Sequence, residues 1–385
     1  MSSSRGLHIP SLDGLRAASF FLVFLAHAGL EAVVPGGLGV TVFFFLSGFL
    51  ITTLMRLELA ETGAVSIRQF YLRRVLRILP PFYTVLLAAA LLSALGALPD
   101  PPQRAALLAQ IFHFTNYWTV WHGYQGQVVG SRVFWSLAIE EHFYLLFPAL
   151  FVLLHRVLPS PRARAAFLWG ICLAILAWRC ILVFGWHAPP DRTYLASDTR
   201  FDSILYGCAL ALVANPALDT ATPAQRALWL RVLLPAGAAG ILISLLFRDP
   251  RFRETFRYSL QGLALYPLFV CVVLNPQLGP FRLLNHPLAR RMGELSYSLY
   301  LLHPVVFSGV KRWLPVHAAL QAAIDLGISL LLSVVIWRWI EQPCARLRKR
   351  LTPQGPRKQL KGVVEAGLPR GDVGLRGVKS TAFED

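Results

Sequence analysis

The chain has 385 residues, of which 55% are hydrophobic and only 15% are charged, and its mean hydropathy is +0.53. Soluble domains have about 45–50% apolar and about 25% charged residues, so this composition excludes an ordinary soluble protein. The formal net charge of +17 lies largely between apolar segments and in the C-terminal stretch, as in membrane proteins with basic cytoplasmic loops. Because no nucleic-acid-binding motif accompanies this charge, we expect membrane lipids rather than nucleic acid as its partner.

Ten segments are long and apolar enough to cross the roughly 30 Å hydrocarbon core of a bilayer as helices. Their hydrophobic pattern lacks the alternation of an outer-membrane barrel. We therefore predict an all-α polytopic integral membrane protein with about ten transmembrane helices. In chain order the predicted spans are 15–30, 38–54, 79–97, 135–154, 166–185, 201–214, 232–247, 259–274, 295–310 and 318–337.

The predicted membrane domain comprises residues 1–343. The remaining stretch, 344–385, is rich in Gly, Pro and Lys and has no apolar period, which predicts a disordered basic cytoplasmic tail. Arg residues also gather in the loops 55–77 and 156–164, so we expect a multi-pass protein of the inner (cytoplasmic) membrane with both termini cytoplasmic. The basic stretch 248–257 would then lie outside and argues against this orientation.

The longest predicted outer loop, 98–133, contains the stretch IFHFTNYWTVWHGYQGQ. This mixture of aromatic and amide side chains suits contact with a sugar, and an aromatic belt at the headgroup level is the alternative interpretation. The five cysteines lie in or beside apolar segments without C-x-x-C spacing. We expect neither disulfides nor a metal site, and the sequence predicts no particular oligomeric state.

The first span, LRAASFFLVFLAHAG, carries Arg16 and His27, which are 11 residues apart. Eleven residues at about 100° each make three turns plus about 20°, so both side chains lie on one helix face, about 16 Å apart along its axis. This predicts Arg16 near the cytoplasmic headgroups and His27 about half-way across the bilayer. Ionisable groups in a span usually face the protein interior or a water-filled cavity. In the alternative, His27 bonds a neighbouring helix and Arg16 extends to the headgroups.

Other predicted spans also carry ionisable residues, and a shared polar cavity would explain them together. They are Glu140, Glu141, His142, Asp202, Glu294, His303 and Glu341. A neutral imidazole is suited to take a proton from a hydroxyl that attacks a carbonyl. A carboxylate, from Glu140 or Glu141, could orient His27 or stabilise its charged form, and the sequence does not distinguish these two glutamates.

Arg74 and Arg77 lie three residues apart at the cytoplasmic end of the third span, in FYLRRVLRILPPFY. At this spacing the two guanidiniums share a helix face and can bind phosphate oxygens together. The alternative is that they are ordinary positive-inside residues. In the second span, Ser47 and Gly48 are small residues that favour close helix packing, and no G-x-S-x-G pattern marks Ser47 as a nucleophile.

Seven stretches resemble, in the same order, acyltransferase family 3 of membrane O-acyltransferases, which modify surface polysaccharides and some macrolides. The resemblance covers about residues 11 to 343. The stretches are LDGLRAASFFLVFLAHAG, GVTVFFFLSGFLIT, FYLRRVLRILP, FWSLAIEEHFYLLFP, RFDSILYGCALAL, GELSYSLYLLHP and WRWIEQP. The resemblance implies a ten-helix enzyme that passes an acyl group, usually acetyl, from cytoplasmic acyl-CoA to a sugar hydroxyl.

Three family motifs match positions in this chain: Arg-x10-His, the donor-linked Arg-x-x-Arg, and a pair of glutamates. They fall on Arg16 and His27, on Arg74 and Arg77, and on Glu140 and Glu141. Two positions depart from the family pattern, because this chain has Val133 where many members have His and His142 where they have Gln. Some members carry a fused hydrolase-like domain. This chain has a short tail in its place and therefore resembles the stand-alone type.

We therefore predict acyl-CoA-dependent O-acylation of a cell-surface polysaccharide or another glycan or glycoside, with acetyl-CoA as the donor substrate and no metal. The arginines would hold the CoA phosphates, the pantetheine arm would carry the thioester toward the membrane centre, and His27 would deprotonate the sugar hydroxyl. Direct transfer and an acyl-enzyme both stay open. The alternative function is a proton-coupled secondary transporter or glycan flippase, which would use the buried ionisable residues as a proton relay and would not need the arginine pair.

Overall fold

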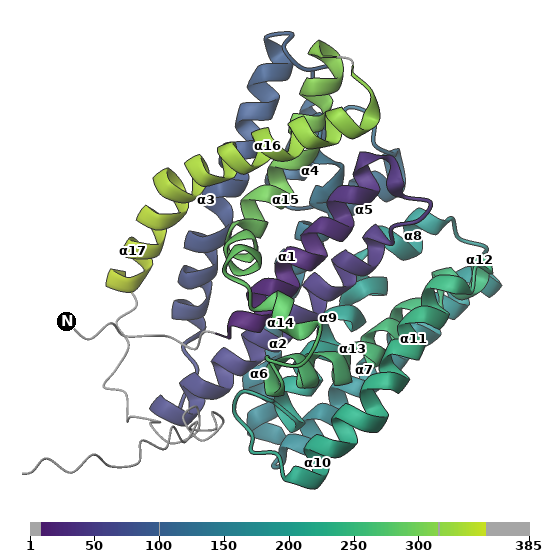
Figure 1. Cartoon of the computed structure of the whole chain (residues 1–385), viewed down its shortest axis with the longest axis vertical. Coiled ribbons are helices and arrows are strands. Elements are labelled where there is room, and N and C mark those ends of the chain that lie inside the picture. Colours follow the sequence, from purple (N-terminus) through teal and green to yellow (C-terminus); the bar gives the residue numbers. More distant parts are fainter. Residues whose placement is uncertain (1–8, 100, 315, 352–385) are drawn as a thin grey trace, which may run out of the picture. The chain divides into compact units, whose positions relative to one another are not determined.

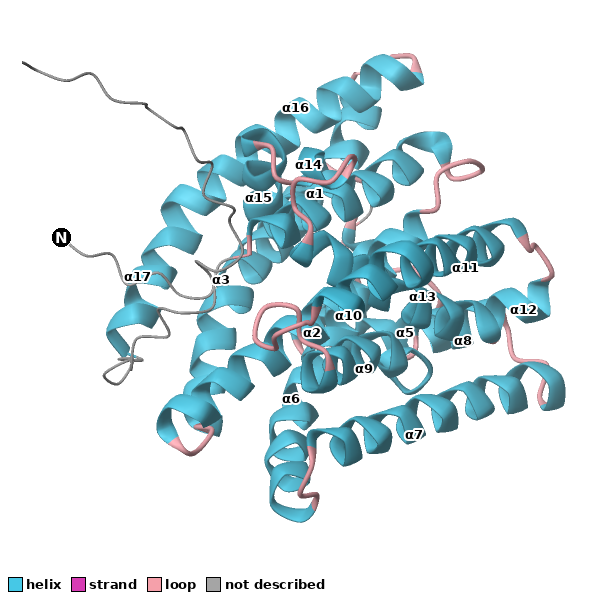
Figure 2. Cartoon of the chain, turned by 60° about the horizontal axis from the view of Figure 1, so that its bottom comes forward, coloured by secondary structure: helices cyan, strands magenta, loops and turns pink. Residues whose placement is uncertain are grey.

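The computed structural model of the chain describes residues 9–99, 101–314 and 316–351. This part of the chain consists of helices joined by short loops and contains no strand (Figures 1 and 2). Several of the long helices include one turn of π-helix, which inserts an extra residue into the helical ladder. The predicted all-α class is confirmed.

Eight stretches of helix are long and apolar enough to cross a membrane. They are Pro10–Leu30 (α1 Pro10–Leu25 and η1 Ala26–Leu30), Gly36–Thr62 (α2), Ile67–Ala94 (α3), Ser131–Val157 (η2 Ser131–Val133 and α6 Phe134–Val157), Pro161–Gly185 (α7 Pro161–Cys180 and η3 Ile181–Gly185), Pro223–Leu246 (α10 Pro223–Leu228, η4 Trp229–Leu233 and α11 Leu234–Leu246), Phe256–Leu274 (α13) and Ala318–Leu351 (α16 Ala318–Ile336, η5 Trp337–Glu341 and α17 Gln342–Leu351). A polytopic all-α membrane protein is thereby confirmed.

Two of the ten predicted spans do not reach this length and hydropathy within the described part of the chain. They coincide with α9 (Ser197–Val213), which has 17 residues, and α15 (Pro287–Trp313), whose first half is polar. Most of α9 is buried among other helices, so a short and partly polar helix is stable there without facing lipid. The positions of α9 and α15 in the bundle are therefore determined by packing against other helices more than by their own hydropathy.

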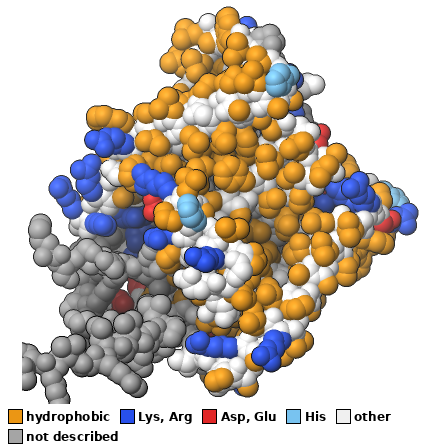
Figure 3. Space-filling view, in the orientation of Figure 1, with side chains coloured by type: hydrophobic (Ala, Val, Ile, Leu, Met, Phe, Trp, Pro, Cys, Tyr) orange, Lys and Arg blue, Asp and Glu red, His pale blue; other side chains and the backbone are white. Residues whose placement is uncertain are grey.

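The helices differ strongly in how much protein covers them. Protein buries 72% of the apolar window of α2, but only 17% of that of Pro223–Leu246 and 22% of that of α7 with η3. Hydrophobic side chains also cover most of the face shown in Figure 3, with Lys and Arg mainly toward its edges. We conclude that α2 is central, whereas α7 and α11 present apolar surface to lipid.

α1 packs against α2 on one side and α15 on the other, as Figure 1 shows, and α2 in turn packs against α9. At the crossing of α2 and α9, a Cβ on Gly48 would lie 2.0 Å from the carbonyl oxygen of Ile204. A Cβ on Gly207 would lie 2.1 Å from that of Phe45. The two backbones are in contact, so the predicted close packing at Gly48 is confirmed.

Asp202 of α9 was predicted to belong to a shared polar cavity, and this is wrong. Its Oδ2 forms an ion pair of 2.7 Å with Arg179 Nη2 of α7, and both side chains are 0% exposed. The same guanidinium donates to Ser259 Oγ and to the carbonyls of Thr199 and Thr255. Because every donor group of Arg179 has a partner, the pair joins α7, α9 and α13 as a structural unit.

The predicted outer loop 98–133 is folded and contains α4 (Arg104–Ile111), α5 (Thr115–His122) and η2. The Asn116 amide donates to Ser197 Oγ at 3.0 Å and to the carbonyl of Leu195, beside the short helix α8 (Pro190–Leu195). Other short helices are α12 (Pro250–Glu254) and α14 (Phe281–Leu284). This amide fixes the loop, and the exposed aromatic side chains Phe112, Phe114 and Trp121 are available for contact with a sugar or headgroup.

The predicted disordered tail begins too early. α17 continues the last spanning helix to Leu351, because Arg, Lys and Leu are good helix formers and the preceding helix supplies the nucleus. Residues 344–351 are therefore helical. The rest of the predicted tail, 352–385, lies outside the described residues.

Candidate active site

A cavity of about 540 Å³ lies between α1, α2, α3, α6, α15 and the last spanning helix. Its charged lining residues are Asp13, Arg16, Arg74, Arg77, Glu140, Glu294, Glu341 and Arg348. The acidic groups mostly bond to other partners: Glu294 to Arg291 at 2.7 Å, and Glu341 to the Ser298 hydroxyl. Within the described residues, neither of these two carboxylates forms an ion pair with Arg16, Arg74 or Arg77.

Arg16 lies in the first third of the first spanning helix and lines the cavity. α1 begins at Pro10, a proline in the first turn, so Arg16 lies about 9 Å along the helix from its start. Its Nη1 forms an ion pair of 3.0 Å with Asp13 Oδ1, one turn earlier, and its side chain is 21% exposed. Arg16 therefore lines the cavity instead of extending to the headgroups.

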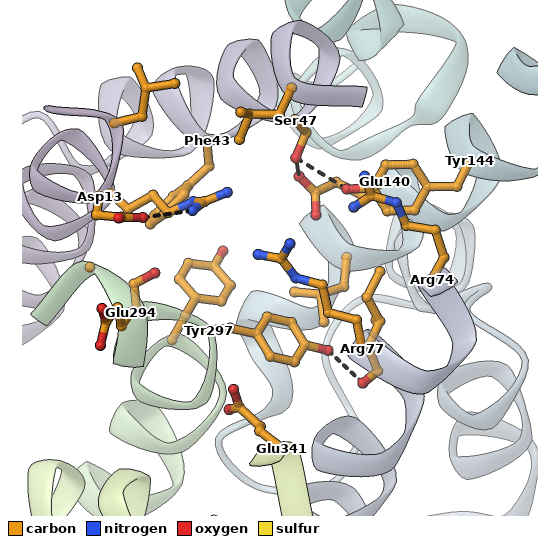
Figure 4. Close-up of a pocket in the computed structure, with 18 of the residues that line it drawn as sticks. Asp13, Phe43, Ser47, Arg74, Arg77, Glu140, Tyr144, Glu294, Tyr297 and Glu341 are labelled. Carbon is orange, nitrogen blue, oxygen red and sulfur yellow. Dashed lines mark hydrogen bonds and ion pairs between the residues drawn. The ribbon is translucent and has the colours of Figure 1, made fainter. Parts of the chain in front are cut away.

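Arg74 and Arg77 of α3 share the cavity, as their spacing predicted. The Arg74 guanidinium lies 5.0 Å from the ring centroid of Tyr144 and 5.7 Å from that of Phe70, which are cation–π contacts. Arg77 forms no ion pair or hydrogen bond with a described residue, and Figure 4 shows it pointing to the middle of the cavity, between Asp13 and Glu140. An anionic ligand in this space would meet guanidinium groups whose donors are largely unused.

Glu140 belongs to a hydrogen-bond chain that links α2 and α6 (Figure 4). Ser47 Oγ donates to Glu140 Oε1 at 2.5 Å and accepts from the Tyr144 hydroxyl at 3.1 Å. Only a packing role was predicted for Ser47, because no local pattern shows that it faces a glutamate 93 residues away. Glu141, by contrast, does not line the cavity, and its buried Oε1 has no hydrogen-bond partner in the described residues.

His27 lies near the C-terminal end of the first spanning helix. The helix formed by α1 and η1 runs from Pro10 to Leu30, so it begins five residues before the predicted span, and His27 is three residues from its C-terminal end. The π-helical turn there includes Gly29, whose φ of 97° ends the regular helix. The His27 side chain is exposed at this end.

The partner of His27 is His303 of α15, since the Nδ1 atom of His27 lies 2.9 Å from Nε2 of His303. The predicted pairing of His27 with Glu140 or Glu141 is wrong. His303 is 1% exposed, and its ring centroid lies 5.9 Å from that of Tyr300. Tyr300 lines the cavity, and its hydroxyl lies 2.8 Å from Ser136 Oγ.

Tyr300 and Ser136 both line the cavity, and the Tyr300 ring connects it to the histidine pair through its contact with His303. The predicted shared polar cavity is therefore correct in part. It contains Glu140, Glu294 and Glu341 but not Glu141, His142, Asp202 or His303.

His142, one of the two departures from the family pattern, faces the folded outer loop. Its Nδ1 lies 2.7 Å from Ser197 Oγ, and its ring packs against Phe114. In the same loop, burial lowers the pKa of His113 to about 4, and the neighbouring His142 lowers it further in the same direction. The ring of His113 packs against that of Phe82, with the two ring centroids 4.5 Å apart.

A family model described as an acyltransferase domain matches residues 9–338 of the chain. The chain belongs to acyltransferase family 3. The chain is 27% identical over 355 residues to the peptidoglycan O-acetyltransferase OatA of Listeria monocytogenes serovar 1/2a, covering 87% of the chain and 56% of that protein. It is 28% identical over 353 residues to the O-acetyltransferase OatA of Staphylococcus aureus (strain NCTC 8325 / PS 47), covering 87% of the chain and 57% of that protein. The chain thus spans little more than half the length of these relatives, and no solved structure matches it.

The described part of the chain contains no group of three or more His, Cys, Asp or Glu side chains arranged to hold a metal ion. Its cysteines are all free, and three of the five are buried. The chemistry that the site offers therefore comes from guanidinium, carboxyl, hydroxyl and imidazole groups.

Proposed function

We propose that this acyltransferase transfers an acyl group, in the first place acetyl, from acyl-CoA to a hydroxyl of a cell-envelope glycan. The observation that carries the proposal is the arginine-lined cavity, whose lining residue Tyr300 contacts the histidine pair. The names of both relatives support O-acetyl transfer, and one of them names peptidoglycan as the acceptor.

The donor fits the cavity through its phosphates. Coenzyme A carries a diphosphate and a ribose phosphate, and guanidinium groups bind phosphate oxygens in pairs. Arg77 is the first candidate because none of its donors is used within the described residues, and Arg74 and Arg16 line the same space. Glu140 balances part of this positive charge before the donor arrives, while Ser47 and Tyr144 hold it in place.

The acceptor hydroxyl reacts at His27 in this proposal. Eleven residues separate Arg16 from His27, or about 16 Å along α1, a span that the flexible pantetheine arm of the donor can bridge. Tyr300 lines the cavity and contacts His303, so in this proposal the Tyr300 side chain moves before the thioester meets the hydroxyl. His27 then acts as the general base, and Glu141 contributes only through the packing of α6.

Purified protein in lipid vesicles, supplied with acetyl-CoA and a peptidoglycan-derived glycan, tests the proposal. We expect CoA thiol release together with acetylated glycan, detected by mass spectrometry. His27→Ala should lose the transfer and keep donor binding, whereas the exposed His122→Ala serves as the matched control and should keep both. Movement of a glycan driven by a proton gradient, without thiol release, would instead support a transporter.

The orientation is part of the same proposal, with both termini and the arginine side of the cavity in the cytoplasm of a bacterial cell. Two single-cysteine substitutions report on the two ends of α2. One is at Val33, which is 84% exposed in the loop before α2, and the other is at the exposed Glu61 near the C-terminal end of α2. In intact cells an impermeant thiol reagent should label the cysteine at position 33 only. Labelling at position 61 alone would reverse the orientation.

A further inference from the structure

The contact between His27 and His303 defines which nitrogen of each ring carries a hydrogen. The two residues are 276 positions apart, and their rings are stacked with centroids 5.2 Å apart and an interplanar angle of 20°. Nδ1 of His303 lies 3.1 Å from the carbonyl oxygen of Leu299, and Nε2 lies 2.9 Å from Nδ1 of His27. Both nitrogens of His303 are therefore engaged.

A carbonyl oxygen can only accept a hydrogen bond, so Nδ1 of His303 must carry a hydrogen that it donates to Leu299. His303 is 1% exposed and packs edge-on against Phe20, surroundings in which a charged ring would be costly. A neutral ring carries a single N–H, so Nε2 of His303 is an acceptor. Nδ1 of His27 must then be the donor in the contact between the two rings.

We propose that His303 is the positioning residue of the reaction, which holds His27 in the Nδ1–H tautomer and leaves Nε2 of His27 as the free base. This inference rests on the proposed function, because it assigns the atom that accepts the proton. It also gives an imidazole the place that a carboxylate holds in many base-and-orienter arrangements. Within the described residues, neither Glu140, which bonds to Ser47, nor Glu141 forms a hydrogen bond with His27.

The step balances without any further reactant. The acceptor hydroxyl gives its proton to Nε2 of His27 while its oxygen forms a bond with the acyl carbon of the donor. The C–S bond then breaks, and the CoA thiolate takes the proton from His27, so the products are the ester and CoA thiol. The neutral His303 ring orients His27 but does not stabilise the imidazolium form of His27 as a carboxylate would. His27 therefore gives its proton more readily to the leaving thiolate. The charged groups that interact with His27 are Glu31 and Arg132.

Solid-state ¹⁵N NMR of the full chain, labelled at histidine and reconstituted in lipid, tests the tautomer directly. The His27 signals are those that disappear in His27→Asn. We expect hydrogen on Nδ1 and none on Nε2. Hydrogen on Nε2 of His27 in the unsubstituted protein would overturn the inference. This result does not depend on any transfer activity, so it separates failure of the tautomer from failure of the proposed function.

Two substitutions of His303 extend the test. His303→Gln keeps a side-chain acceptor, so it should keep the Nδ1–H tautomer of His27 and most of the transfer activity. His303→Leu removes the acceptor, so His27 should no longer be held in the Nδ1–H tautomer. In the Leu variant we expect kcat to fall at least about 100-fold with an unchanged KM for acetyl-CoA, since general base catalysis contributes about 10²- to 10⁴-fold. Equal loss in the two variants, or an unchanged His27 tautomer in His303→Leu, would show a merely structural role. If His303→Leu does not fold, the spectra of the unsubstituted protein and His303→Gln still decide.

Discussion

The buried ion pair between Arg179 and Asp202 makes a quantitative prediction about stability. Asp202→Asn keeps the shape of the side chain but leaves the fully buried Arg179 guanidinium without a counter-charge. Breaking one partner of a buried pair costs about 3–5 kcal/mol. The matched control is Glu294→Gln, which breaks the pair of Arg291 and Glu294 whose side chains are 43% and 42% exposed. Exposed pairs contribute about 0–1 kcal/mol, so the two substitutions should differ by several kcal/mol.

Thermal unfolding of both variants in detergent measures this difference. A double variant, Asp202→Leu with Arg179→Met, removes both charges and should recover most of the lost stability, because apolar groups of similar volume replace buried ion pairs well. We expect transfer activity to follow stability in Asp202→Asn and in the double variant, since Asp202 lies outside the cavity. Equal melting temperatures for Asp202→Asn and Glu294→Gln would refute the structural role of the pair of Arg179 and Asp202. A stable double variant without transfer activity would show that the pair is needed for the reaction.

Three further substitutions test the packing and the outer loop. Ser47→Ala removes the donor to Glu140 and should lower the free energy of unfolding by about 1.5–3 kcal/mol, measured by thermal unfolding; an unchanged melting temperature would argue against that bond. Gly48→Val should greatly reduce the yield of folded protein, because a Cβ there meets the α9 backbone at 2.0 Å, and normal yield would contradict the contact. Burial lowers the pKa of His113 from 6.5 to about 4. As the pH falls, the unfolded chain therefore binds a proton before the folded protein does. The free energy of unfolding should then be lower at pH 5 than at pH 8 by about 2 kcal/mol because of His113. His113→Asn should remove that part of the pH dependence of melting, and an identical pH dependence in the variant would contradict the burial.

The parts of the site that share a helix could be predicted from the sequence. Arg74 and Arg77 are one turn apart on α3, and helical geometry alone puts both guanidiniums at the same cavity. The depth of Arg16 and His27 could not be predicted in the same way. Apolar residues define a span by composition, whereas α1 begins at Pro10, within a polar stretch that includes Asp13.

The partners across helices were not predictable from one sequence. His303 lies 276 residues from His27, and Ser47 lies 93 residues from Glu140, so no local period relates them. Asp202 looked like the other ionisable residues inside spans, because the sequence does not show that Arg179 reaches it from α7. Gly48 was the exception, since a small residue in a span favours close packing whichever helix it meets.

The most direct test of the account is the thermal stability of the purified protein with and without acetyl-CoA. At 100 times its dissociation constant the donor should stabilise the protein by about 2.7 kcal/mol. We predict this stabilisation in the unsubstituted protein and in the matched control Arg156→Ala, Arg162→Ala, whose arginines are exposed and lie outside the cavity. It should be absent in the double variant Arg74→Ala, Arg77→Ala. Equal stabilisation in that variant, or none in the folded unsubstituted protein at saturating donor, would contradict the claim that the cavity binds acyl-CoA.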